Sequence, residues 1–414
     1  MKLFNLLFCG ILCFWWPFGG SQLLAQPGGI QLKRNKVIGE IPFEQFQNLI
    51  ILNVQINDKL PIRLILDTGA QYTIITDRQI MDIMEVHYDR DIKIYGSDRT
   101  RILHAKLATQ VALDLPSVRF NNQAVLVLDE DYLNLTNIIG TTVHGIMGTD
   151  LFKRFVVKID YYKSKIILYE PEAFKAPDAE FTRVPLNIIN GKPYVRLPLT
   201  LEAGNQVEPV LLVDSGASLS FVIHPNTYEE INIPDHIVNG NIGYGLGGEV
   251  RGFMGRIDEL RFPPFEFKNL VTNFQDLPNF GDTLSVEPRQ GFVGGEILQR
   301  FTVIFDFVEN QMYLKPNKRF KTRFKPDLSG IILYAIGQEL NDFLVADVLL
   351  SSPAYRAGVR VNDQIYKVNG RSAASFTVQS LGKLFSSKSG KRITLTIGRR
   401  GHKYKIKFRL TEYI

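Results

Sequence analysis

The sequence predicts a mostly β protein, with two homologous β-rich lobes followed by a smaller C-terminal unit of β-strands with two helices. Three observations lead to this prediction: a repeated tetrapeptide after an apolar run, matched landmarks downstream of each copy, and a break in charge near residue 325. The chain has 414 residues, which is more than one hydrophobic core usually holds. We therefore expect two or three domains.

Nearly the same short stretch occurs twice. "LILDTGAQYTIIT" occupies residues 64–76 and "LLVDSGASLSFVI" occupies residues 211–223, so Asp67 and Asp214 lie 147 positions apart. Each copy is an apolar run that ends in Asp-Thr/Ser-Gly-Ala. This repetition indicates an internal duplication.

The downstream landmarks keep the same spacing. "GIMG" begins 78 positions after Asp67 and "GFVG" begins 77 positions after Asp214. A further aspartate follows each motif, Asp160 after 93 positions and Asp306 after 92, and we interpret this pair as structural. A period near 147 is too long for a solenoid, so it predicts two copies of one lobe. The predicted lobes span residues 38–172 and 182–316.

Each lobe is expected to be built from short strands. Runs such as "LIILNVQIN" and "AVLVLD" are β-branched or alternating, and Gly, Asn, Asp and Pro interrupt them. Only residues 77–86 and residues 149–155 favour helices.

The repeated tetrapeptide predicts a specific chemistry. An apolar strand that ends in Asp-Thr/Ser-Gly places a carboxylate on a tight turn, where glycine lets another chain approach closely. One copy would be ordinary turn chemistry. Two facing carboxylates cannot both ionise easily, so they share one proton. The charged group can then act as a general base on water and the protonated group as a general acid on an amide carbonyl.

These motifs resemble those of aspartic proteases. The connectivity is similar to the two-lobed pepsin type, and the compact lobes are similar to the retroviral type. The resemblance covers residues 38–316 and rests on "LILDTGA", "LLVDSGA", "GIMG" and "GFVG". It implies two pepsin/retropepsin-like β-barrel lobes with an interlobe cleft, and Asp67 and Asp214 as the catalytic dyad. The implied supporting residues are the interlobe hydroxyls Thr68 and Ser215 and the turn residues Gly69 and Gly216.

The fourth position of each motif is alanine, as in retroviral enzymes. Ala70 and Ala217 cannot donate the hydroxyl hydrogen bond that would stabilise an ionised dyad. We therefore expect raised dyad pKa values and activity that extends toward neutral pH.

Two glycine-bearing segments lie where a flap could close over a peptide. They follow the two aspartates by 28 to 31 positions and are flanked by strand-like residues. The candidates are Tyr95, Gly96, Tyr244 and Gly245. The alternative is that both segments are ordinary surface hairpins.

The last part of the chain resembles a bacterial PDZ domain. Residues 317–325 read as a basic, solvated linker, and residues 326–414 carry the resemblance through "SPAYRAGV", "DQI" and "VNG". Such a domain binds a peptide C-terminus as an added strand, with backbone N–H groups holding its carboxylate. The resemblance implies a carboxylate-binding loop formed by Leu328, Ser329, Gly330 and Ile331.

Charge is distributed unevenly along the chain. Residues 325–414 hold 15 Lys/Arg and 6 Asp/Glu, whereas the remainder has a balance of −3. The excess could favour acidic peptides or an anionic surface, or it could simply solvate the C-terminal unit.

The N-terminus predicts export. Residues 1–25 combine Lys2 with an apolar run and small residues, which is typical of a signal peptide cut after Ala25 or near Ser21; an uncleaved anchor is the alternative. Both cysteines lie in this segment, so the mature chain would have no disulfide. We expect a bacterial protein of the periplasm or cell envelope, or a secreted one.

The functional prediction is an exported aspartic endopeptidase whose PDZ domain recruits or orients peptide substrates. The histidine spacing predicts no metal site, and we expect no cofactor and no nucleic-acid partner. One chain carries both aspartates, so a monomer suffices for catalysis. Two alternatives stay open: a non-catalytic peptide-binding scaffold of the cell envelope, and a protease that processes one envelope protein.

Overall fold

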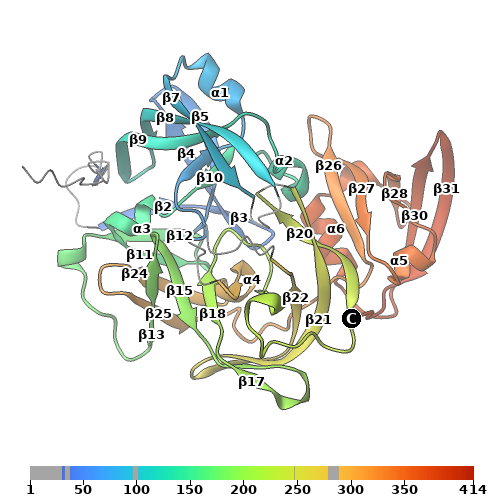
Figure 1. The fold of residues 1–414 in the computed structure, drawn as a ribbon. Helices are drawn as coiled ribbons and strands as arrows, with labels where there is room; N and C mark the ends of the chain where they lie inside the picture. Colours follow the sequence, from blue (N-terminus) through green and yellow to red (C-terminus); the bar gives the residue numbers. More distant parts are fainter. Residues whose placement is uncertain (1–29, 33–37, 97–100, 247, 278–288) are drawn as a thin grey trace, which may run out of the picture.

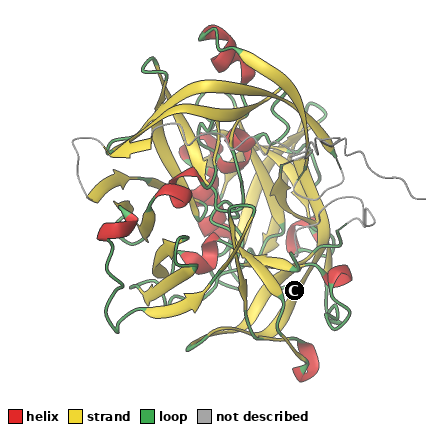
Figure 2. Cartoon of the chain, turned by 60° about the vertical axis from the view of Figure 1, so that its left-hand side comes forward, coloured by secondary structure: helices red, strands yellow, loops and turns green. Residues whose placement is uncertain are grey.

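The computed structural model describes residues 30–32, 38–96, 101–246, 248–277 and 289–414. Strands dominate it, which confirms the mostly β prediction (Figures 1 and 2). The predicted signal segment lies outside the described residues. The helices are short: α1 (Arg78–Ile83), α2 (Leu135–Ile139), α3 (Asp150–Arg154), α4 (Gly295–Leu298), α5 (Pro353–Arg356) and α6 (Val378–Phe385).

The first lobe is organised around a sheet with strand order β1-β9-β6-β10-β5-β4-β8-β7, and β3 pairs with β4. Apolar runs explain the central strands, since most side chains of β4 and the last three of β5 are buried. The strands are β1 (Ile30–Leu32), β3 (Glu44–Phe46), β4 (Leu49–Ile56), β5 (Leu60–Leu66), β6 (Thr73–Ile75), β7 (Tyr88–Tyr95), β8 (Ile102–Asp114), β9 (Val118–Leu128) and β10 (Gly145–Met147).

The second lobe repeats this plan with strand order β14-β15-β18-β23-β19-β22-β21-β16-β17, and β20 pairs with β21. The long β20–β21 hairpin extends toward the C-terminal unit (Figure 1). The strands are β14 (Asn187–Ile189), β15 (Lys192–Arg196), β16 (Leu199–Thr200), β17 (Gln206–Val207), β18 (Val210–Val213), β19 (Phe221–Ile223), β20 (Val238–Gly245), β21 (Gly248–Phe262), β22 (Phe265–Phe274) and β23 (Gly291–Val293).

A third sheet joins the two lobes, with strand order β13-β25-β24-β11-β12-β2. Its central pair is β11 of the first half and β24 of the second, where Ile159 lies opposite Val303. Each lobe contributes one hairpin, β11–β12 from the first and β24–β25 from the second. β2 and β13 form the two outer edges of the sheet. The strands are β2 (Ile38–Pro42), β11 (Val156–Asp160), β12 (Lys165–Tyr169), β13 (Thr182–Pro185), β24 (Phe301–Asp306) and β25 (Gln311–Pro316).

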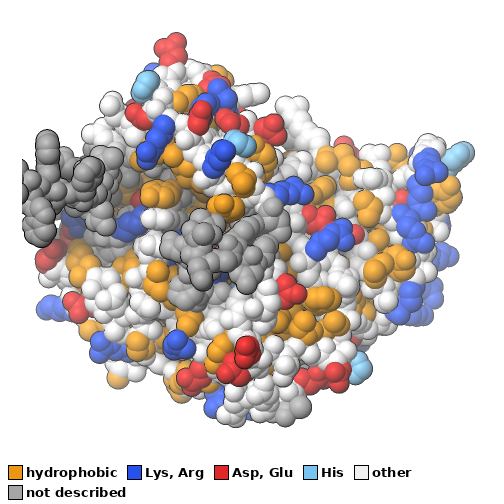
Figure 3. Space-filling model, viewed as in Figure 1, with side chains coloured by type: hydrophobic (Ala, Val, Ile, Leu, Met, Phe, Trp, Pro, Cys, Tyr) orange, Lys and Arg blue, Asp and Glu red, His pale blue; other side chains and the backbone are white. Residues whose placement is uncertain are grey.

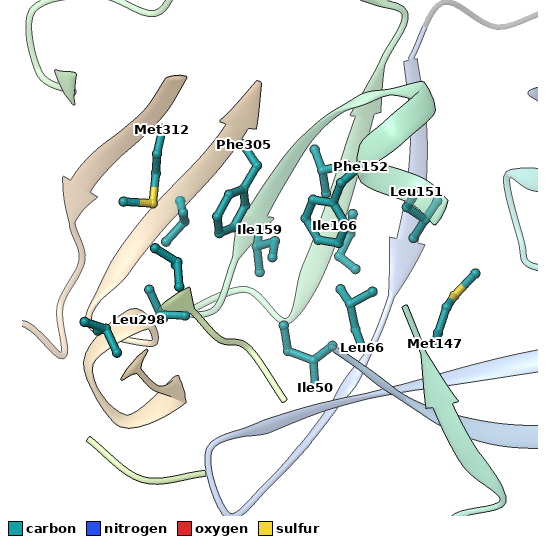
Figure 4. Packing of buried hydrophobic residues seen from close by; sticks show 14 of the residues in the cluster. Ile50, Leu66, Met147, Leu151, Phe152, Ile159, Ile166, Leu298, Phe305 and Met312 are labelled. Atoms are coloured by element: carbon teal, nitrogen blue, oxygen red, sulfur yellow. The ribbon is translucent and has the colours of Figure 1, made fainter. Parts of the chain in front are cut away.

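The main hydrophobic core runs through this joint rather than stopping at a lobe boundary. Phe152 and Phe305 pack edge to face with ring centroids 5.3 Å apart, and Ile159 lies beside them (Figure 4). Buried residues from both lobes belong to the same cluster. Because the core is continuous, it does not mark where one lobe ends, and the bounds 38–172 and 182–316 stay a prediction.

The C-terminal unit has its own sheet and its own core. Its strand order is β26-β27-β28-β30-β31, so β26 is an edge strand. Lys and Arg gather over its outer edge (Figure 3), where exposed basic residues of β31 alternate with buried Ile406 and Phe408. This pattern favours simple solvation of that charge. The strands are β26 (Ile331–Ile336), β27 (Asp342–Val348), β28 (Gln364–Val368), β29 (Arg371–Ser372), β30 (Arg392–Arg399) and β31 (His402–Arg409).

The two predicted helical segments are helical in part. The first contains α1, whose N-cap Asp77 accepts a hydrogen bond from the Gln79 amide, and the second contains α3. Helix α2 was not predicted; it has five residues and ends at Gly140 in the left-handed conformation. A helix this short depends on its tertiary contacts for stability.

The predicted linker, residues 317–325, exposes most of its basic side chains, but two of its phenylalanines pack against the second lobe. The basic side chains alternate with Phe320 and Phe324, and these rings pack against the second lobe. The Phe301 and Phe320 ring centroids lie 5.3 Å apart, and the guanidinium of buried Arg300 lies 3.6 Å from the Phe324 centroid. The C-terminal unit therefore follows a segment that is anchored to the second lobe.

Candidate active site

Asp67 and Asp214 each follow a central strand of their lobe, β5 and β18. A second short strand, β10 or β23, lies parallel to that strand and antiparallel to the next one, β6 or β19. The Asp67 amide donates to the Met147 carbonyl, and the Asp214 amide donates to the Val293 carbonyl, each at 2.9 Å. The apolar-apolar-Gly strands thus hold the two aspartate turns in equivalent positions.

The glycines that end these short strands are required by close approach of the aspartate loops. A Cβ on Gly148 would lie 2.6 Å from the Ala70 carbonyl oxygen, and a Cβ on Gly294 would lie 2.2 Å from that of Leu219. Both distances are far below a normal contact. The second repeated signature therefore supports the first one sterically.

Thr68 and Ser215 connect the two turns by crossed hydrogen bonds. The Thr68 amide donates to Ser215 Oγ at 3.1 Å, and the Ser215 amide donates to Thr68 Oγ1 at 2.9 Å. Each hydroxyl then donates to a backbone carbonyl of the other lobe, Thr68 to Val213 at 2.6 Å and Ser215 to Leu66 at 2.9 Å. Both side chains are fully buried, so this network fixes the turns relative to each other.

The two carboxyl groups meet across this seam and share a hydrogen bond. Gly69 and Gly216 allow the approach, since a Cβ on Gly216 would lie 2.2 Å from Asp67 Cγ and one on Gly69 would lie 2.9 Å from Asp214 Oδ2. The Gly69 amide donates to Asp67 Oδ1 at 2.6 Å. Asp214 Oδ1 accepts from the amides of Gly216 at 2.9 Å and of Ala217 at 3.1 Å.

The electrostatics make the pair asymmetric. Burial, the charge of Asp214 and the hydrogen bond to Asp214 raise the pKa of Asp67 well above its ordinary value. Burial also raises the pKa of Asp214, but the hydrogen bond from Asp67, the charge of Arg289 and the two backbone amides oppose that shift. We therefore assign the shared proton to Asp67 and the negative charge to Asp214.

The dyad lies on a cavity of about 1500 Å³ that extends from the lobe interface to the C-terminal unit. Its lining includes hydrophobic side chains of α2 and both candidate flap segments. Lys192 and Arg289 line it close enough to lower the pKa of Asp67 and Asp214, respectively. Glu296 also lines it, and burial raises its pKa to about 6. Sequence reasoning missed these three residues, since only the fold brings them to the dyad.

The candidate flap residues all line this cavity. Tyr95 ends β7 and is 43% exposed, and the Gly96 amide closes the hairpin by donating to the Arg101 carbonyl at 2.9 Å. Tyr244 and Gly245 end β20, but the Tyr244 ring contacts Tyr334 of the C-terminal unit, with centroids 5.6 Å apart. The second hairpin is thus packed against that unit.

The predicted carboxylate-binding loop precedes β26, and its amides already have acceptors within the chain. Asp327 Oδ1 accepts from the Ser329 amide at 2.8 Å and from the Gly330 amide at 2.5 Å. The Ile331 amide donates to Ser329 Oγ at 3.1 Å, and the Leu328 amide donates to the Phe385 carbonyl at 3.1 Å. The sequence predicted Ser329 as part of this loop but did not single out Asp327, which precedes it.

Comparison with known proteins supplies independent support for this architecture. Residues 52–151 match the aspartyl protease family model, a span that includes Asp67 and Gly148, and residues 344–399 match the PDZ domain family model. The chain is an aspartyl-protease-like protein with a C-terminal PDZ domain. These matches support a peptidase in general terms, and protease and PDZ domains are both suited to binding peptide or protein substrates.

Several individual proteins are similar to parts of the chain. A probable CtpA-like serine protease of Staphylococcus saprophyticus is 31% identical over 147 residues, or 34% of this chain, and the match spans 28% of that relative's length. Among solved structures, the aspartic proteinase of Irpex lacteus aligns with 69% of this chain and 99% of its own at 13% identity and a TM-score of 0.41. Basic 7S globulin from soybean aligns with 69% of this chain and 95% of its own at 10% identity and the same TM-score.

None of the helices among the described residues is long and apolar enough to cross a bilayer. Within the same ranges, no three His, Cys, Asp or Glu side chains form a group suited to a metal ion.

Proposed function

We propose that this chain is an exported aspartic endopeptidase that hydrolyses peptide bonds with Asp67 and Asp214. The observation that carries the proposal is the hydrogen-bonded carboxyl pair at a cavity large enough for a peptide. The PDZ domain lines this cavity and so takes part in orienting the substrate. The N-terminal segment supports export to a bacterial periplasm or cell envelope, and a monomer holds both catalytic groups.

The mechanism follows from the asymmetry of the pair. Charged Asp214 accepts a proton from a water molecule as the water oxygen bonds to the scissile carbonyl carbon, while Asp67 donates its proton to the carbonyl oxygen. The resulting tetrahedral diol returns a proton to Asp67 as its C–N bond breaks, and Asp214 delivers its proton to the leaving nitrogen. Both carboxyls then regain their starting states, with no covalent intermediate.

The test uses conservative replacements of the dyad. Asp67→Asn and Asp214→Asn keep size and hydrogen-bonding capacity but remove the shared proton and charge, and we expect each to lower kcat/KM on a peptide mixture by roughly 10²–10⁴-fold. Asp91→Asn, at an exposed strand position, is the matched control and should keep wild-type activity. Activity that survives both dyad replacements would rule out the dyad, and peptide binding without cleavage by the wild type would favour the scaffold.

A pH–rate profile tests the state of the carboxyls. The raised pKa of Asp67 keeps its proton in place over a wider range, so kcat/KM should be bell-shaped with activity extending toward neutral pH. A profile confined below about pH 4 would contradict the assigned pKa directions.

A further inference from the structure

The groove of the PDZ domain lies between edge strand β26 and helix α6, and a helix of the first lobe lies at the end of it formed by Ala335 and Val378. The rest of the groove, with Leu333 and Gly382, lines the catalytic cavity. Helix α2 contacts both elements, as Figure 1 also shows. The contact is tight at Gly140, where an added Cβ would lie 2.6 Å from Val378 Cγ2 and 3.8 Å from Ala335 Cβ. Val378 begins α6, and Ala335 lies near the end of β26.

At the opposite end of the groove, a carboxylate of the domain itself accepts hydrogen bonds from the loop amides. A bound peptide would place its terminal carboxylate on the amides before β26. Asp327 already accepts from the amides of Ser329 and Gly330, and the Ser329 hydroxyl accepts from the Ile331 amide. The loop therefore presents no amide that lacks an acceptor.

The second lobe also contacts β26. The Tyr244 and Tyr334 ring centroids lie 5.6 Å apart, and Tyr334 belongs to β26. A Cβ on Gly240 of β20 would lie 2.7 Å from Leu349 Cδ2, so this strand also approaches the PDZ domain closely. An incoming peptide strand would have to displace contacts with both lobes.

The side of α2 away from the PDZ domain belongs to the catalytic cavity. Ile139 is buried with Leu49 and Ile65, and Ile65 is in the strand that ends immediately before Asp67. Gln47 Nε2 donates to the Ile138 carbonyl at 3.1 Å, and Leu135 lines the cavity. The same short helix thus both closes one end of the groove and forms part of the cavity wall.

We propose that the PDZ groove binds α2 of its own chain and excludes peptide carboxyl termini, so that the domain holds one wall of the catalytic cavity instead of capturing chain ends. The consequence for hydrolysis rests on the proposed function, whereas the groove's occupancy does not. The domain then affects substrate selection through the shape of the cavity.

Peptide binding tests the exclusion without relying on cleavage. The probe is a fluorescent octapeptide ending in Val-Ile, compared with its C-terminal amide, on the full chain carrying Asp67→Asn. We expect the two forms to bind within twofold of each other. Adding Asp327→Ala and Val378→Gln together should strengthen binding of the free acid at least tenfold over the amide. Tenfold preference for the acid before these changes would overturn the proposal, as would no preference after them.

Hydrogen exchange tests the docking of α2 directly. In the otherwise unchanged chain, Val378→Gln should speed exchange of residues 135–140 at least tenfold and lower kcat/KM. Val361→Gln is the matched control, because Val361 is a 48% exposed valine of the same domain. Unchanged exchange of residues 135–140 in a folded Val378→Gln variant would show that the groove does not hold α2. If the wild type cleaves nothing, the exchange result still decides the proposal.

Discussion

Removing the Thr68 hydroxyl tests how the two halves of the site are held together. Thr68→Val replaces the hydroxyl with a methyl group of similar size at a side chain that is fully buried. The change leaves the Ser215 amide without its acceptor at 2.9 Å and the Val213 carbonyl without its donor at 2.6 Å. Both groups stay buried in the folded state, so the cost falls mainly on folding.

The magnitude follows from these two orphaned groups. A buried polar group without a partner costs about 1–3 kcal/mol, so two of them should lower the free energy of unfolding by about 2–6 kcal/mol. Thr68→Ser keeps both hydrogen bonds and loses one methyl group, and its cost should be about 1 kcal/mol.

Urea unfolding of both variants provides the measurement, and far-UV circular dichroism follows it. Tryptophan fluorescence would not report on the folded lobes, because both tryptophans lie in the first 25 residues. The Val variant should also lose kcat, since the carboxyls are no longer held in register. If Thr68→Val costs no more than Thr68→Ser, the crossed hydrogen bonds do not hold the turns and this reasoning is wrong.

Three further predictions follow from the same site. Asp67→Asn should raise the free energy of unfolding at pH 7. The pKa of Asp67 is raised in the folded state, so the wild type loses stability as pH rises. Urea midpoints should show this gain at pH 7 and not at pH 4. Gly294→Ala should cost more than about 3 kcal/mol because its Cβ would lie 2.2 Å from the Leu219 carbonyl oxygen, whereas Gly382→Ala, in helix α6 with open space around it, should stabilise by up to about 1 kcal/mol in the same assay. Burial raises the pKa of Glu296 from 4.5 to about 6, so its ionised form destabilises the fold. The stability of Glu296→Gln relative to the wild type should therefore increase by about 2 kcal/mol from pH 4 to pH 8. A difference that is independent of pH would contradict this.

The features that sequence reasoning found are those written into short, repeated motifs. The matched spacing of "DTGA" with "GIMG" and of "DSGA" with "GFVG" predicted two equivalent turns, and the structure brings Asp67 and Asp214 into hydrogen-bonding contact. The strand that precedes each aspartate is an apolar run, so its burial could be predicted locally. A steric role for the second signature also follows, since Gly148 and Gly294 touch the aspartate loops.

The features that it missed depend on contacts between distant segments. Helix α2 has too few residues to show a helical period, and its position is fixed by packing against the first lobe and the PDZ domain. Phe320 and Phe324 lie in a strongly basic segment whose charge masked their packing. Asp327 reads as an ordinary turn residue until the structure shows which amides it binds.

Side-chain carboxyl titration by carbon-13 NMR measures the central claim without any substrate. Comparing the wild type with Asp67→Asn and Asp214→Asn isolates the signals of the two groups among the remaining carboxyls. We predict that the pair gives up its two protons in well-separated steps and holds one of them, on Asp67, at mildly acidic pH. Two independent titrations near the ordinary aspartate value of about 3.9 would contradict the account.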